Sequence, residues 1–142
     1  MKMIKTPLLI PLCALFCYAC AEVDPKDCGM AVCSAQVDTV YLHVRDSLLQ
    51  PVALDTFKLT NMLDRTPVAT PPADPALWEK MRATGDYIFL TDAFVKGHEN
   101  TRVVIEFTGI LRQRTIFWHA VTFDIDCCHI SPVYGELTVT VY

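Results

Sequence analysis

Alternating apolar and polar residues dominate the chain from residue 37 onward. In residues 37–45, Val40, Leu42 and Val44 alternate with polar or aromatic residues, the pattern of a strand with one buried face. Segments of the same kind recur to the end of the chain. The expected strands cover residues 37–45, 52–59, 87–91, 102–107, 115–125 and 136–142. The pattern therefore predicts an all-β protein.

The connections between these segments indicate how the strands are arranged. Turn residues follow most of the expected strands, and no helical crossover separates successive strands, as a parallel sheet would require. Several short strands with one polar face are typical of an antiparallel β-sandwich. We expect about six to seven strands, and we expect the sandwich to occupy residues 35–142.

One stretch interrupts the strand pattern. Residues 66–73 are rich in proline and are expected to form an extended, exposed loop. Asp74 then offers an N-cap, Pro75 suits the first helical position, and Gly85 suits the position after the last turn. A helix this short is not stable alone. We therefore expect Trp78 to pack it against the sandwich.

The first 19 residues have the composition of a secretory signal. Lys2 and Lys5 precede the apolar run LLIPLCALF and a few small residues. Ala19 followed by Cys20 resembles the lipobox of bacterial lipoproteins. By that resemblance, the Cys20 sulfur would carry a diacylglycerol and its freed amine an acyl chain, which together anchor a protein stably to a membrane. Residues 20–34 would then form a tether that contains a cysteine doublet.

This interpretation predicts a location and leaves two alternatives. We expect a lipid anchor in a bacterial cell envelope, at the outer membrane, facing the periplasm or the surface. Cleavage after the small-x-small triplet Ala19-Cys20-Ala21 would instead give a soluble secreted protein. An uncleaved apolar anchor is the third possibility, although the run is short for a membrane span.

Cleavage of the expected signal would also change the number of cysteines in the mature protein. Of seven cysteines, four lie beyond the expected anchor: Cys28, Cys33, Cys127 and Cys128. Four cysteines permit three pairings. Neighbouring residues of a strand point to opposite faces, so Cys127 and Cys128 are expected to reach different partners. We predict two disulfides between the upstream and downstream pairs, in an order that the sequence leaves open.

A metal site is the alternative for this cluster. Cys127, Cys128 and His129 offer two thiolates and an imidazole. Zinc sites favour two to four residues between paired cysteines, and the gap between Cys28 and Cys33 is at the edge of that range. An oxidising exported compartment favours disulfides. With free thiols, these residues would instead indicate a thiol- or metal-dependent enzyme, or a metal-binding protein.

The motif around these cysteines resembles a known group of proteins. Asp126-Cys127-Cys128-His129, after a long strand and before a final strand, resembles the C-terminal motif of small bacterial cell-envelope lipoproteins. Cys28 and Cys33 match the upstream cysteine doublet of that group. Pro51-Val52 and Gly85 resemble its carboxypeptidase-regulatory-like, prealbumin-type sandwich, an immunoglobulin-like architecture. The resemblance implies a fold and an envelope location but no activity.

The charge of the chain and the motifs that it lacks argue against several classes of function. Loss of Lys2 and Lys5 leaves 10 basic against 16 acidic side chains, a net charge of −6 instead of −4. Nucleic-acid binding needs clustered Lys and Arg, which this chain does not have. The sequence contains neither a Gly-rich phosphate loop nor a G-x-S-x-G nucleophile motif. We therefore expect no nucleic-acid partner, no cofactor and no enzymatic activity.

A few other polar residues are weaker candidates for a site. His119 falls on an apolar strand face and is expected to be a core histidine bonded to a neighbour. Asp124 and Asp126 could form a calcium site, and a cation or glycan could bind at Asp86, Asp92, Glu99 and Asn100. We favour solvated carboxylates for both. The sequence thus indicates a non-enzymatic envelope lipoprotein that binds a protein or a glycan or has a structural role, with a soluble secreted accessory protein as the alternative.

Overall fold

The computed structural model describes residues 28–29, 31–69 and 71–142. The export signal expected at residues 1–19 and the lipidation expected at Cys20 lie outside the described residues, as does much of the tether expected at 20–34. Within the described part of the chain, no helix combines the length and the apolar character that a membrane crossing needs.

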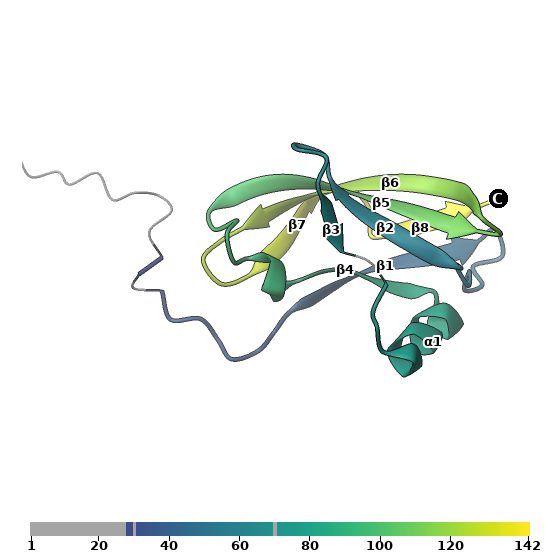
Figure 1. The fold of residues 1–142 in the computed structure, drawn as a ribbon, viewed down its shortest axis with the longest axis horizontal. Helices are drawn as coiled ribbons and strands as arrows, with labels where there is room; N and C mark the ends of the chain where they lie inside the picture. The colour runs from purple at the N-terminus through teal and green to yellow at the C-terminus, as the bar shows by residue number, and fades with distance from the viewer. Residues whose placement is uncertain (1–27, 30, 70) are drawn as a thin grey trace, which may run out of the picture.

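Two β-sheets form a sandwich (Figure 1). One sheet has three strands in the order β4-β1-β8, and the other has five in the order β3-β2-β5-β6-β7. The strands are β1 (Thr39–Asp46), β2 (Thr56–Asn61), β3 (Pro67–Ala69), β4 (Asp86–Thr91), β5 (Thr101–Leu111), β6 (Arg114–Ile125), β7 (Ile130–Tyr134) and β8 (Thr138–Val141). The all-β sandwich with one short α-helix is thereby confirmed.

The core lies between the two sheets, where the alternating apolar residues meet. The buried strand residues include Leu42, Val44, Phe57, Leu59, Tyr87, Phe89, Val103, Ile105, Phe107, Val121, Phe123 and Ile125. Aromatic rings join the sheets: the ring of Phe89 lies edge-on to Phe107, with centroids 5.7 Å apart, and to Phe123 at 5.2 Å. Such pairs add to the stabilisation from apolar burial itself. The two-residue period therefore identified the buried faces correctly.

The described residues form eight strands, where about six to seven were expected. The two additional strands, β3 and β7, are the edges of the five-stranded sheet, and each contains a proline. β3 falls within residues 66–73, which the sequence analysis assigned to a loop. A proline cannot donate to a neighbouring strand, which argues against a central strand but is compatible with an edge. The prolines therefore explain why the sequence did not predict β3 and β7.

One strand pair also departs from the antiparallel expectation. β8 pairs parallel to β1, with Val44 opposite Val139, whereas the other pairings of the named strands are antiparallel. β7 and β8 run in the same direction because the chain crosses from one sheet to the other between them without reversing. Gly135 lies in this crossing at a φ of 103°, a backbone conformation that favours glycine.

Residues 52–55, before β2, form a loop that is held by side-chain hydrogen bonds and is not the start of a strand. The sequence predicted a strand over residues 52–59, but β2 begins at Thr56. The buried Tyr87 hydroxyl donates a hydrogen bond to the Val52 carbonyl oxygen (2.8 Å) and accepts one from the Leu54 N–H (2.7 Å). These bonds satisfy backbone groups that a strand partner would otherwise satisfy. Burial raises the pKa of Tyr87.

The expected helix is present as α1 (Pro75–Thr84). Asp74 caps its start by accepting a hydrogen bond from the Ala76 N–H (2.9 Å), and Gly85 ends it in the left-handed conformation. The Trp78 ring lies 6.0 Å from Phe57 and 5.9 Å from Tyr87, centroid to centroid. Trp78 therefore joins α1 to the core of the sandwich, as the sequence analysis expected.

Replacing Trp78 by alanine should destabilise the protein measurably. We expect Trp78→Ala to lower the free energy of unfolding by about 3 kcal/mol, because the truncation removes aromatic contacts that hold α1. Trp118, on β6, is 71% exposed and is the matched control. Trp118→Ala should change stability by less than about 0.5 kcal/mol. Urea unfolding followed by circular dichroism measures both, and equal losses would contradict the assigned role of Trp78.

Candidate functional site at the disulfide end of the sandwich

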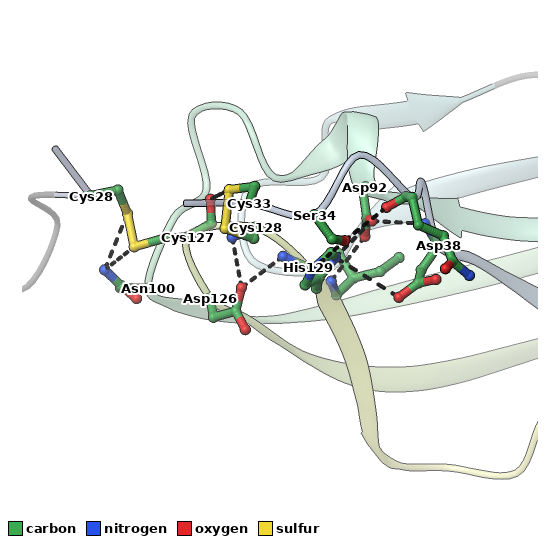
Figure 2. The surroundings of a disulfide bond; sticks show 12 residues. Cys28, Cys33, Ser34, Asp38, Asp92, Asn100, Asp126, Cys127, Cys128 and His129 are labelled. Carbon is green, nitrogen blue, oxygen red and sulfur yellow. Dashed lines mark hydrogen bonds and ion pairs between the residues drawn. A yellow bond between two sulfur atoms is a disulfide. The ribbon is translucent and has the colours of Figure 1, made fainter. Parts of the chain in front are cut away.

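Two disulfides join the segment before β1 to the loop between β6 and β7 (Figure 2). Cys28 is bonded to Cys127 and Cys33 to Cys128, with Cα atoms 5.5 and 5.2 Å apart. The sequence left the pairing order open, and the structure supplies it. Neither sulfur of the adjacent pair is bonded to its neighbour. Both bridges lie at the same end of the sandwich as the start of β1.

The turn that presents Cys127 and Cys128 is built around Asp126. One oxygen of its carboxylate, Oδ1, accepts hydrogen bonds from the backbone N–H groups of Cys128 and His129, both at 2.7 Å. This arrangement is an Asx-type turn, in which the side chain replaces a backbone acceptor. The two hydrogen bonds lower the pKa of Asp126, although partial burial opposes the shift. The carboxylate therefore holds both cysteines in place as a local structural element.

His129 lies beside the second disulfide and contacts three side chains. Its Nδ1 atom is 2.9 Å from Oδ2 of Asp92 and 3.8 Å from Oδ2 of Asp38, and its Nε2 atom is 3.4 Å from Oγ of Ser34. The imidazole is 30% exposed. The hydrogen bond to Asp92 raises the pKa of His129, and the negative charges of the nearby aspartates add to that effect, while burial opposes it.

Asp92 is the residue on which these contacts converge. It begins the short 3-10 helix η1 (Asp92–Phe94), which directly follows β4, and its side chain is only 10% exposed. Its Oδ2 accepts the Asp38 N–H (2.8 Å), and its Oδ1 accepts the Ile130 N–H (3.2 Å). Burial raises the pKa of Asp92, but these hydrogen bonds and the one from His129 outweigh it, so the pKa is lowered. Asp92 thus stays ionised.

The nucleophilic chemistry considered for this cluster is not available in the bridged structure. A catalytic cysteine must be a thiolate, and Cys127 and Cys128 are both in disulfides. Ser34, His129 and Asp92 lie in line, but the 3.4 Å from Ser34 Oγ to Nε2 exceeds the usual reach for proton abstraction. The arrangement is better described as a polar network that fastens the segment before β1 to the sandwich.

The structure does not assemble either of the weaker candidate cation sites. Asp124 forms a bidentate ion pair with Arg102, on a neighbouring strand, through contacts of 2.5 and 2.8 Å. Asp86 lies near the opposite end of the sandwich from Asp92, bonded to Arg45 and His43. Asn100 lies beside the Cys28–Cys127 bridge, with its amide nitrogen 3.3 Å from the Cys127 sulfur. His119 is bonded to the Glu136 carbonyl oxygen (2.7 Å) but is half-buried, not in the core.

Two members of this cluster were missed in the sequence. Asp38 and Ser34 carry no motif, and Asp92 was grouped with Asp86, which the structure places at the opposite end of the sandwich. A signal did exist: a bond between Cys33 and Cys128 necessarily brings their neighbours Ser34 and His129 close together. Finding it required the pairing order, which four cysteines in sequence do not reveal.

Because the two bridges connect the same two segments, we expect removal of the first and of the second bridge to lower the free energy of unfolding by unequal amounts. Because one bridge already closes the long loop, the double variant Cys33→Ser/Cys128→Ser should lower the unfolding free energy by only about 2 kcal/mol. Replacing all four cysteines opens a loop of roughly 100 residues as well and should cost about 7 kcal/mol in total. Guanidinium unfolding of the three proteins measures this, and an additive, equal loss for each bridge would contradict the model of mutual support.

The comparisons with known proteins add no relative. No family model, no curated protein and no solved structure matches this chain.

Proposed function

We propose that the protein is an exported lipoprotein of a bacterial envelope, in which the disulfide-stapled sandwich acts as a non-enzymatic binding or structural module. The observation that carries the proposal is the position of the two bridges. They join residues a few positions beyond Cys20 to one end of the sandwich. A lipid on Cys20 would therefore hold the domain by that end.

The opposite end is then free to make contacts. It is formed by the connection between β1 and β2 and by the tight turn between β5 and β6 (Figure 1). The Asp55 N–H, in the first connection, donates a hydrogen bond to the Ile110 carbonyl oxygen of β5 (2.9 Å). Leu48 and Leu49 in the first connection are 76% and 72% exposed. Exposed apolar side chains on loops held by a rigid scaffold commonly serve recognition.

A small cleft supports a binding role on the same side. It has a volume of about 210 Å³ and lies between α1 and the strands β1 and β4. Leu77 and Met81 of α1 supply apolar lining, and His43 and Lys80 add polar groups. Mixed lining of this kind is usual for ligand sites, although the volume is below the usual range for a drug-sized ligand. A partner segment that inserts one side chain would fit it better than a cofactor.

The lipid anchor can be tested directly. We expect the wild-type protein to incorporate labelled palmitate in the producing bacterium and to enter the detergent phase on phase separation. Cys20→Ser should abolish both, because it removes the acceptor sulfur. Cys13→Ser is the matched control, since it changes a cysteine within the expected signal and should leave both results intact. Aqueous partitioning of all three proteins would contradict the anchor.

The free end should be the contact surface in the intact envelope. We expect a photo-crosslinking residue at Leu49 to give more partner adducts than one at Val37, because Val37 lies at the disulfide end. The two positions are similarly exposed, at 72% and 67%. Adducts are compared by gel mobility and identified by mass spectrometry. A Val37 yield equal to or above that of Leu49 would contradict display of the free end.

A further inference from the structure

Three side chains with metal-binding atoms converge beside the Cys33–Cys128 bridge (Figure 2). Asp38 lies just before β1, Asp92 begins η1, and His129 lies in the loop between β6 and β7. Each offers one ligand atom, and the three atoms all lie within 4.8 Å of one another. We propose that these residues bind one divalent transition-metal ion, with zinc as the best match.

The spacing of the ligand atoms suits such an ion. Zinc binds imidazole nitrogen and carboxylate oxygen at about 2.0–2.2 Å in a tetrahedron, which places neighbouring ligand atoms roughly 3.3–3.5 Å apart. The distances from Nδ1 of His129 are 2.9 Å to Asp92 and 3.8 Å to Asp38, one on either side of that value. A metal ion would replace the Nδ1 proton that is now shared with Asp92. Water would complete the coordination.

The ligands are already oriented by hydrogen bonds. Oδ1 of Asp92 accepts the Ile130 N–H, and Oδ2, the proposed ligand atom, also accepts the backbone N–H of Asp38. Nε2 of His129 faces Ser34 Oγ, so a hydrogen on Nε2 has an acceptor while Nδ1 binds the ion. Metal-ligating histidines usually have such a partner on the second nitrogen. The neighbouring disulfide holds the chain segments that carry Ser34 and His129 together.

The local charge also favours a cation. The carboxylates of Asp38 and Asp92 lie 3.8 and 2.9 Å from Nδ1 of His129, and the Asp126 carboxylate accepts the backbone N–H of the same residue. Among the described residues, the recorded ion pairs of Asp38 and Asp92 are both with His129. One imidazolium cannot balance these carboxylates. A divalent ion would neutralise them while keeping the contacts between the three segments.

The ligand types decide which metal fits. Imidazole suits zinc, copper and nickel, whereas calcium prefers six to eight oxygen ligands, more than this cluster supplies. The nearby sulfur atoms are in disulfides and do not compete as ligands. This set differs from the Cys127, Cys128 and His129 site considered from the sequence. The proposed metal site goes beyond the proposed function and does not depend on a lipid anchor.

Zinc titration of the exported, disulfide-intact protein tests the proposal. The protein is purified without a polyhistidine tag, stripped with chelator, and titrated with zinc by calorimetry at neutral pH. We expect one zinc ion per chain and an increase in the melting temperature on binding. Asp38→Asn and His129→Asn should each weaken zinc binding by about tenfold or more, because an amide is a poor ligand. His129→Asn keeps an N–H group that can donate a hydrogen bond to Asp92.

A matched control separates this site from surface histidines. His119→Asn removes another half-buried histidine and should leave the affinity unchanged. Asp38 is 54% exposed, so we expect Asp38→Asn to fold. Absence of zinc binding, or equal binding by wild type and both site variants, would overturn the proposal. Tighter binding of calcium than of zinc would overturn the assignment to a transition metal. Circular dichroism confirms that each variant is folded.

Discussion

The arrangement of this protein depends on two covalent links between chain segments that are almost a hundred residues apart. Cys28–Cys127 and Cys33–Cys128 span 99 and 95 positions, which is nearly the whole described chain. They connect the segment that leads into β1 with the loop that follows β6. Asp38 and Ser34 add side-chain contacts to Asp92 and His129. The bridges fix the segment that carries Cys28 and Cys33 to one end of the sandwich.

Much of this fold can be read from the sequence because it follows from local patterns. Alternation identified the inner faces of β1, β5 and β6, since burial on one side of a strand imposes a two-residue period. Asp74, Pro75 and Gly85 placed α1 correctly because capping is a short-range interaction. An even number of cysteines beyond the expected signal indicated the bridges, because paired cysteines are typical of proteins in oxidising compartments.

The features that were missed depend on tertiary context. β3 and β7 are edge strands that tolerate proline because one side of each has no neighbour in its sheet. The parallel pairing of β8 follows from the crossing between sheets, which no local pattern encodes. Residues 52–55 form a loop because the Tyr87 hydroxyl, from across the core, bonds to the backbone of Val52 and Leu54. The cluster of Asp38, Asp92 and His129 combines three distant segments, so only the folded chain brings it together.

The two ends of the sandwich suggest a division of roles. One end gathers the bridges, the turn at Asp126 and the histidine–aspartate cluster, all of which hold the segment that leads into β1 to the domain. The other end carries exposed leucines and the cleft beside α1. With the proposed lipid on Cys20, force on the anchor would act on covalent bonds. A metal ion at the cluster would reinforce the same end.

The most direct test of this account is the intact mass of the exported protein before and after reduction, with a thiol-alkylating reagent present. The account predicts that the unreduced, denatured protein lacks the first 19 residues and that Cys28, Cys33, Cys127 and Cys128 all resist alkylation until they are reduced. Peptide mapping should then recover Cys28 linked to Cys127 and Cys33 linked to Cys128. A protein that begins at Met1 and alkylates at all four of these cysteines without reduction would contradict it.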